Sequence, residues 1–348
     1  MTVTITKPSF NLRDALVSLK RKIGIKGAEL MAAETADDVY RVINPAGFKN
    51  LLINGDMRVA QRGTSSTTDN NYATVDRWFK YSGGDTTTWG QAEDAVHGKY
   101  AYWSANTSGY GNLRQRIEGI HVPSGGLPMV FSCWMRVSAG SAPFRIEIWN
   151  LTDNTDILSN MNVTTITTSW QQVVVPFTLP ASANNDVFHI MVGSNSAPSQ
   201  VVFNMTKCQL ERGTVATPFE HRLYGTELAL CQRYLTVFGT PANNQYVHLG
   251  IATLYTATAI NLAVALPVSM RTTPSLTTVL NGSSVWLQTY IGASGINSNA
   301  IVATGEYLSV GSNTIRLYCT GAYSGGTVGQ SAWCQVMNGA QLQFLSEL

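Results

Sequence analysis

The chain has 348 residues, of which 44% are hydrophobic and only 13% are charged, about half the charged share of an ordinary globular protein. Its 23 basic and 21 acidic side chains give a formal net charge of +2, so no strong field steers it to nucleic acid or to an anionic membrane. The length suits two or three domains, and the lack of an apolar run of about 18 residues predicts no membrane insertion.

Residues 1–49 are predicted to form a short α-helical segment. Four aliphatic side chains recur there at spacings of four, three and four, which is typical of a short coiled-coil seam: Leu12, Leu16, Leu19 and Ile23. Two heptads are too few for an independent coiled coil. Packing on the same chain and oligomerisation or docking on a partner are therefore both open, and these four residues are the candidates for self-association.

Residues 50–222 are predicted to form a β-sandwich. Apolar and polar side chains alternate with period two in 131–137, 144–150, 169–177 and 187–193, as in strands with one buried face. Gly, Pro, Asn and Ser separate these segments, which favours an antiparallel all-β sandwich. Trp134 and Trp149 alternate with the aliphatic side chains of their segments, so we expect both to lie on one face away from the core.

Residues 223–348 are predicted to form a second β-sandwich after a short linking helix near 225–234. From residue 234 onward the chain holds only four charged side chains: Arg271, Glu306, Arg316 and Glu347. A surface so poor in charge is unfavourable for a free monomer, so we expect identical copies or a neutral, hydroxyl-rich partner to cover it. Asn-Gly pairs at 281–282 and 338–339 predict two-residue hairpins.

Four motifs stand in order along the chain: NLLINGDMRVAQRG (50–63), VDRW (75–78), CQLERGTVATPFEHR (208–222) and LALCQRY (228–234). Together they resemble a module of tail fibres and related appendages of tailed bacteriophages. The inner pattern, with LRQRIEG (113–119), VFSCWMRV (130–137), SWQQVVVPF (169–177) and CQLERG (208–213), is similar to jelly-roll carbohydrate-binding modules of families 4 and 9. The resemblance covers about 50–234 and implies a two-sheet jelly roll that binds rather than catalyses.

The sequence offers no arrangement that favours catalysis. Carboxylate pairs such as Glu93 and Asp94 lie in turn-rich stretches without the apolar surroundings that raise a carboxyl pKa, and no GxSxG nucleophile motif occurs. The five histidines and five cysteines lack metal-ligand spacing. We therefore expect neither enzyme activity nor a cofactor. The resemblance often implies a structural calcium, for which Asp56 and Glu211 are the acids to watch. A surface or turn position is the alternative for each of them. Lys207 stands where an acid is frequent, so metal ligands stay unassigned.

A sugar ring offers a C–H face for aromatic stacking and hydroxyls for hydrogen-bonding side chains. The candidate carbohydrate-binding residues are Trp134 and Trp149 with Arg145 and Glu147 nearby, and Trp89, Trp103 and Tyr110 in Gly-, Thr- and Ser-rich stretches that predict loop rims. Packing in the core or against the next subunit is the alternative for each tryptophan. Trp78 and Trp170 are assigned to the core. Aromatic residues of the last domain, Trp333 among them, line either a tip surface or a buried core.

These features and the resemblance together predict a structural, non-enzymatic tail fibre protein of a phage virion, assembled in the host bacterial cytoplasm. The N-terminal segment would dock on the tail or baseplate. A homotrimer would bury the charge-poor surface and strengthen weak contacts to a host cell-surface glycan through multivalency. Two alternatives are open: a polysaccharide depolymerase whose carboxylates meet at subunit interfaces, and a purely architectural fibre spacer.

Overall fold

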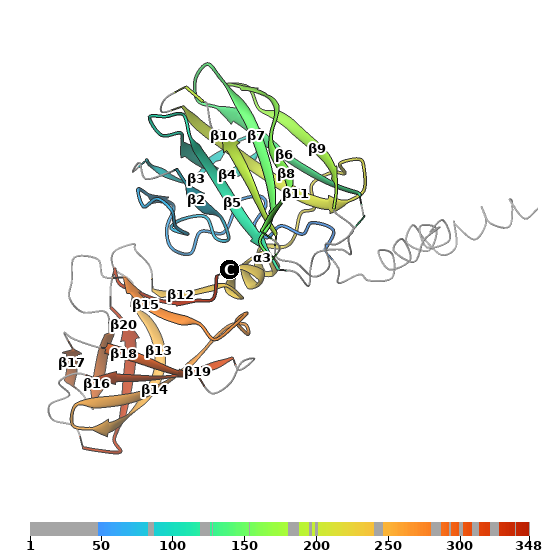
Figure 1. Cartoon of the computed structure of the whole chain (residues 1–348). Helices are drawn as coiled ribbons and strands as arrows, with labels where there is room; N and C mark the ends of the chain where they lie inside the picture. Colours follow the sequence, from blue (N-terminus) through green and yellow to red (C-terminus); the bar gives the residue numbers. More distant parts are fainter. Residues whose placement is uncertain are drawn as a thin grey trace, which may run out of the picture. The chain divides into compact units, whose positions relative to one another are not determined.

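The computed structural model describes residues 48–347 apart from 83–86, 119–125, 127, 153, 180–187, 195–196, 199–200, 240–245, 280–286, 292–293, 299–301, 308–312, 321–326 and 338, and it leaves out the side chains of 159–162, 294–298 and 302–307. The predicted N-terminal helix, with its candidate seam Leu12, Leu16, Leu19 and Ile23, lies outside these residues. Strands dominate the described part, which contains one α-helix, so the mainly β prediction is confirmed (Figure 1). Asn50–Leu348 forms one compact unit.

The first part of this unit is a sandwich of two antiparallel sheets. One has the strand order β1-β3-β4-β11-β6-β9, with β1 (Ser65–Ser66), β3 (Trp89–Asp94), β4 (Gly98–Ser104), β11 (Val202–Arg212), β6 (Pro128–Val137) and β9 (Gln171–Thr178). The other has the order β2-β5-β10-β7-β8, with β2 (Phe79–Tyr81), β5 (Gly111–Ile117), β10 (Phe188–Ser194), β7 (Ser141–Asn150) and β8 (Thr155–Thr167). The chain crosses repeatedly between the sheets, as in a jelly roll.

The core of this sandwich lies between the two sheets and is rich in aromatic rings. Its large, fully buried aromatic side chains are Trp78, Trp89, Trp103, Phe131, Phe144 and Phe203. Trp89 lies directly opposite Trp103 across β3 and β4, and Trp103 stacks on Phe203 with ring centroids 5.4 Å apart. Trp78 is thus a core residue as predicted. The prediction of loop rims for Trp89 and Trp103 is wrong, because the two pair across neighbouring strands and face inward.

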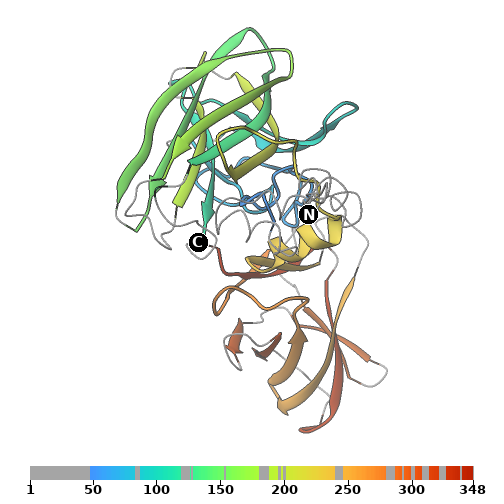
Figure 2. The same ribbon diagram turned by 90° about the vertical axis from the view of Figure 1, so that its right-hand side faces the viewer.

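The second part begins with the predicted linking helix, α3 (Tyr224–Gln232), and continues as two more antiparallel sheets (orange to red in Figures 1 and 2). The three-stranded sheet has the order β12-β21-β15, with β12 (Leu235–Gly239), β21 (Gln341–Leu345) and β15 (Ser275–Val279). The seven-stranded sheet has the order β17-β16-β20-β13-β14-β19-β18, with β17 (Ser294–Ser298), β16 (Leu287–Ile291), β20 (Ser331–Val336), β13 (Val247–Thr256), β14 (Ala259–Ala265), β19 (Thr314–Thr320) and β18 (Val302–Tyr307).

These two sheets also share a core, which includes Leu262, Leu317 and Phe344. The hairpin predicted at 281–282 lies outside the described residues. The hairpin predicted at 338–339 is wrong, since β20 and β21 lie in different sheets. A turn does form at the second Asn-Gly pair: Ala340 N donates to Met337 O at 3.0 Å. That turn leads the chain from one sheet to the other instead of returning it beside the strand it has just left.

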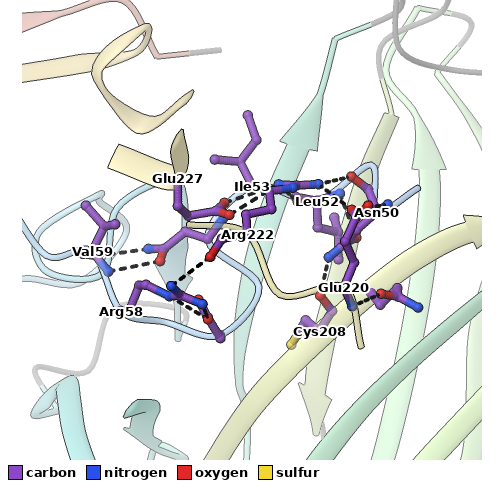
Figure 3. A network of polar contacts seen from close by, with 12 residues as sticks. Asn50, Leu52, Ile53, Arg58, Val59, Cys208, Glu220, Arg222 and Glu227 are labelled. Carbon is purple, nitrogen blue, oxygen red and sulfur yellow. Dashed lines mark hydrogen bonds and ion pairs between the residues drawn. The ribbon is translucent and has the colours of Figure 1, made fainter. Parts of the chain in front are cut away.

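A buried polar cluster, which we name the junction network, joins the start of the jelly roll to α3 (Figure 3). It consists of Asn50, Asn54, Arg58, Glu220, Arg222 and Glu227. Arg222 Nη1 donates to Leu52 O at 3.1 Å and lies 3.2 Å from Glu227 Oε1. The Glu227 carboxylate also accepts a hydrogen bond from the Asn54 backbone amide. A buried ion pair needs such additional hydrogen bonds, because its mutual attraction alone does not offset the loss of solvation.

The asparagine side chains of the network form hydrogen bonds with backbone N–H and C=O groups. Asn50 Nδ2 donates to Cys208 O at 2.9 Å, and Asn50 Oδ1 accepts from Leu210 N at 3.0 Å. Asn54 bonds the backbone of Val59 in both directions, as acceptor at 3.0 Å and as donor at 2.8 Å. The two asparagines and their backbone partners all come from 50–63 and 208–222. The motifs that carry the resemblance therefore serve largely to build the junction.

A second set of contacts ties the end of β21 to the jelly roll. The guanidinium of Arg77 forms an ion pair with Glu347 and donates to Arg116 O at 2.6 Å. It also lies 3.5 Å from the ring centroid of Tyr234, within the range of a cation–π contact. Ser346 N donates to Tyr234 O at 2.8 Å. The last described residues and the residues just after α3 are therefore held together.

Candidate functional site

The outer face of the five-stranded sheet gathers aromatic, charged and amide side chains in three rows, and we call it the β10 face. Directly opposite residues on neighbouring strands present their side chains on the same face of a sheet. The rows run Tyr81–Asn112–Gly193–Arg145, Phe79–Arg114–Met191–Glu147 and Arg116–His189–Trp149–Asp156. The predicted candidates Arg145, Glu147 and Trp149 thus lie together on one face. Their strand, β7, runs next to β10 (Figure 1).

Aromatic rings border one end of this face. Tyr110, another predicted candidate, meets Tyr81 edge-on with ring centroids 5.7 Å apart. The Arg114 guanidinium lies 3.9 Å from the Tyr81 ring centroid, and its Nε donates to Asn112 Oδ1 at 3.0 Å. Tyr81, Arg114 and Asn112 are thereby fixed relative to one another, which is the preorganisation a binding surface requires.

The charged side chains that β7 contributes to the face, Arg145 and Glu147, are poorly exposed. The side chains of Arg145 and Glu147 are 12% and 15% exposed, with Arg145 Nη2 3.7 Å from Glu147 Oε2. Burial raises the pKa of the Glu147 carboxyl, and the Arg145 charge opposes that rise. At 3.7 Å the two side chains attract each other without a close hydrogen bond, so both keep hydrogen-bonding capacity.

Two nitrogen atoms of the face are buried without a hydrogen-bond partner, Arg145 Nε and His189 Nε2. His189 is 9% exposed, and burial together with the positive charges of Arg114 and Arg116 lowers its pKa to about 4. The imidazole is therefore neutral at pH 7. Leaving a buried polar group unsatisfied costs about 1–3 kcal/mol, and a ligand that supplies the missing partner recovers that free energy.

Gly193 leaves one position in the floor of the face without a side chain. It stands between Asn112 and Arg145 in the first row, where every other strand contributes a side chain. A Cβ atom at this position would lie 2.2 Å from Gly111 O and 2.7 Å from Asn112 Cβ. Only glycine fits there, because both clashing neighbours belong to the adjoining strand rather than to a side chain that can turn away.

Trp134 lies on the other sheet, so the prediction that it shares a face with Trp149 is wrong. Period-two alternation in β6 and β7 turns both rings away from the core, but the two strands belong to opposite layers. The rings of Trp134 and Trp170 each lie 4.8 Å from the His97 ring. Trp170 is partly exposed there and is not the core residue that was predicted.

Asp94 holds this second cluster together. Its carboxylate accepts from Trp170 Nε1 at 2.6 Å and from the backbone amide of His97 at 2.6 Å. Burial works against the charged carboxylate, but these hydrogen bonds outweigh it and lower the pKa of Asp94. Arg136 lies 4.8 Å from the Trp170 ring centroid. Contacts within the cluster thus occupy much of its aromatic surface.

A third aromatic group lies on the outer face of the seven-stranded sheet. Trp333 is 40% exposed, and its ring lies 4.3 Å from His248 and 5.1 Å from Tyr290. On the same face Ile251 is 71% exposed. Trp333 therefore belongs to a surface rather than to a buried core.

The two acids considered as calcium ligands are engaged by other side chains. Asp56 lies in a turn and forms an ion pair with Arg58. Glu211 is fully buried, where a surface or turn position was predicted, and it accepts from Thr217 N at 2.8 Å and from Gln209 Nε2 at 2.8 Å. Among the described residues no three His, Cys, Asp or Glu side chains gather into a metal-binding group. The described part of the chain also has no helix with the length and apolar character to cross a membrane.

Sequence reasoning missed most of the partners on the β10 face. His189 and Met191 lie in β10, and Asn112 and Arg114 lie in β5. The signal was available in the alternation of 113–119 and 187–193, which places His189 and Arg114 opposite the aliphatic side of their strands. What alternation does not give is the strand order that brings β5, β10 and β7 side by side.

No protein-family model matches the chain, and no curated protein matches it. Among solved structures, a family 4 carbohydrate-binding module matches 46% of this chain over 98% of its own length, with 16% identity and a TM-score of 0.34. The enzymatically active domain of bacteriophage CBA120 tailspike protein 4 matches 47% of this chain over 22% of its own, with 12% identity and a TM-score of 0.34. A cyclase from Fischerella sp. matches 48% of this chain over 99% of its own, with 12% identity and a TM-score of 0.37. Fold likeness does not by itself give function, so function has to be argued from the residues of the site.

Proposed function

We propose that this protein is a non-enzymatic structural component of a tailed-phage tail that adheres to a glycan on the host cell surface through the β10 face. The observation that carries the proposal is the composition of that face: Trp149 and Tyr81 offer ring surface, while Arg145 and His189 hold hydrogen-bonding nitrogens without partners. A saccharide presents both a C–H face and many hydroxyls, and it meets both requirements at once.

A binding role suits these residues better than catalysis does. Hydrolysis of a glycosidic bond uses two carboxyl groups that flank one bond. On the β10 face the described carboxylates are Glu147, beside Arg145, and Asp156, exposed at the edge next to Trp149. The depolymerase alternative, with carboxylates brought together by neighbouring subunits, is tested by the experiment below.

The tail role and the homotrimer rest on two supports. The motif order in residues 50–234 resembles phage tail appendages, and the last sandwich exposes neutral aromatic and aliphatic side chains such as Trp333 and Ile251. Three copies would cover part of that surface and would present three β10 faces, so weak single contacts add through effective concentration. The N-terminal segment is the proposed attachment to the tail or baseplate.

A binding comparison between two matched tryptophan variants tests the adhesion proposal. The full chain, Trp149→Ala and Trp134→Ala are each applied to an array of bacterial surface polysaccharides. Loss of Trp149 should weaken binding about tenfold or more, as the loss of a stacking ring does, while Trp134→Ala retains it. Equal binding by both variants, or binding by neither the full chain nor the variants, would overturn the proposal and favour a purely architectural spacer.

Three further measurements test the remaining parts. Incubation with each bound polysaccharide should release no new reducing ends, and release would establish the depolymerase instead. Light scattering of the full chain should give the mass of three copies. Antibody labelling of intact virions in the electron microscope should place the protein on the tail, and labelling confined to another part of the particle would remove the tail assignment.

A further inference from the structure

The β10 face has more positive than negative groups. Its described charged side chains are Arg114, Arg116 and Arg145 against Glu147 and Asp156. Burial raises the pKa of the Glu147 carboxyl, and the Arg145 charge opposes that rise. The described part of the face thus carries an excess of one positive charge.

The two unpartnered nitrogens lie at opposite ends of the face. Arg145 and His189 stand in the first and third rows, which are separated by about 13 Å at roughly 3.3 Å per residue along a strand. Arg145 Nε is a donor and never an acceptor. A ligand that satisfies both nitrogens therefore has to be extended, and it has to offer acceptors at two separate points.

We infer that the β10 face selects an extended glycan bearing anionic groups, carboxylate or sulfate, over a neutral glycan; this rests on the proposed function of the face. A hydroxyl would satisfy Arg145 Nε, but an anionic oxygen forms a shorter, charge-assisted bond of about twice the strength. A guanidinium also matches the planar geometry of a carboxylate. Trp149, beside His189 in the third row, supplies the ring on which a sugar unit stacks.

Affinity for an anionic glycan should depend on pH because of His189. The charged groups that face its ring are Arg114 and Arg116 on β5, Glu147 on β7 and Asp156 on β8. Burial, together with the two arginines, keeps the ring neutral in the free protein, and a bound anion opposes the effect of the arginines. The bound state then takes up a proton more readily than the free state, so affinity rises as the pH falls from 7 towards 5.

The experiment compares matched glycans on the full chain. Uronate-bearing bacterial polysaccharides are applied beside their carboxyl-reduced forms, and sulfated polysaccharides beside their desulfated forms. We expect binding to concentrate in the anionic members, to drop about tenfold or more on reduction or desulfation, and to weaken with added salt, because exposed charge interactions are screened. The two arms distinguish carboxylate from sulfate as the preferred group.

Three variants locate the effect. Arg145→Gln should bind anionic glycans about tenfold more weakly, and Arg136→Gln, which removes the same charge from the opposite sheet, should bind like the parent chain. His189→Gln should flatten the rise in affinity at lower pH. If carboxyl-reduced or neutral glycans bind as tightly as anionic ones, the inference fails and the adhesion proposal survives. If no glycan of either kind binds, both fail.

Discussion

The junction network and the β10 face both hold arginine and glutamate side chains at low exposure, yet they differ in the partners that these charges have. Arg222 contacts the carboxylates of Glu227 and Glu220 and the carbonyl oxygens of Leu52 and Asn50. Arg145 instead has a carboxylate at 3.7 Å, too far for a close hydrogen bond. The first arrangement stabilises the fold by itself, whereas the second keeps hydrogen-bonding capacity for a ligand. The difference separates scaffold from binding surface more clearly than residue type does.

The strongest test of this difference is Glu227→Ala. It leaves the buried Arg222 without its principal counter-charge, and breaking a buried ion pair costs about 3–5 kcal/mol. The midpoint of chemical denaturation should fall accordingly. Glu220→Ala is the matched control, because its side chain is 24% exposed and the expected loss is about 1 kcal/mol or less. An unchanged midpoint for Glu227→Ala would mean that the junction network does not stabilise the fold.

The dependence of stability on pH should contain two opposing contributions, one from Asp76, whose backbone oxygen accepts from Asn54 of the junction network, and one from His189 on the β10 face. Burial raises the pKa of Asp76 to about 6, and the Gln61 side chain, which donates at 2.6 Å, opposes the rise. Because the folded state holds this proton more tightly than the unfolded state, Asp76 makes the protein less stable as the pH rises from about 4 to 6. The effect approaches about 3 kcal/mol.

His189 changes the stability in the opposite direction over nearly the same pH range. Its pKa is lowered to about 4 in the folded state, so its contribution is lost as the pH falls from about 6.5 to 4. Denaturation at several pH values should show that Asp76→Asn removes the first slope and His189→Gln the second. Equal slopes in both variants and the parent chain would refute the assignment of these two groups.

Gly193→Ala tests how closely β5 and β10 have to pack beneath the β10 face. The new Cβ would meet Gly111 O at 2.2 Å, so β5 and β10 have to separate, at a cost of about 1–3 kcal/mol. Thermal unfolding should report the loss. Gly225→Ala in α3 is the control, since open space surrounds that position and alanine favours a helix. A Gly193→Ala variant as stable as the parent would show that the floor of the face tolerates a side chain.

The smallest effect on stability is expected for Arg145→Met. The change removes a buried donor that has no acceptor, so the free energy of unfolding should stay within about 0.5 kcal/mol of the parent value or rise slightly. Glycan binding should nevertheless fall. A loss of stability as large as that of Glu227→Ala would place Arg145 with the scaffold.

Much of the local structure could be predicted from the sequence. Alternation located β6, β7, β9 and β10, and it correctly turned Arg145, Glu147 and Trp149 away from the core. It could not assign a strand to a sheet, because period two fixes which side chains face inward but not which of the two layers a strand joins. Trp134 and Trp149 were therefore placed on one face when they lie on opposite ones.

Composition was a weaker guide than alternation. Trp89 and Trp103 stand among Gly, Thr and Ser residues that usually indicate loops, yet their pairing across β3 and β4 buries both rings. His189 was missed as a site residue, because its neighbours Phe188 and Ile190 belong to the core and a single histidine carries no signal of its own. Its role depends on Arg114 and Arg116, which only the strand order brings near.

The pairing of β12 with β21 has a consequence for how the last sandwich can be exchanged. The chain enters this sandwich at Leu235 and leaves it at Leu345, and these residues lie directly opposite each other on neighbouring strands. A foreign domain whose own first and last strands pair in the same way could replace 236–344 without rerouting the backbone. The last sandwich could therefore be exchanged as a unit while the jelly roll and its β10 face stay unchanged.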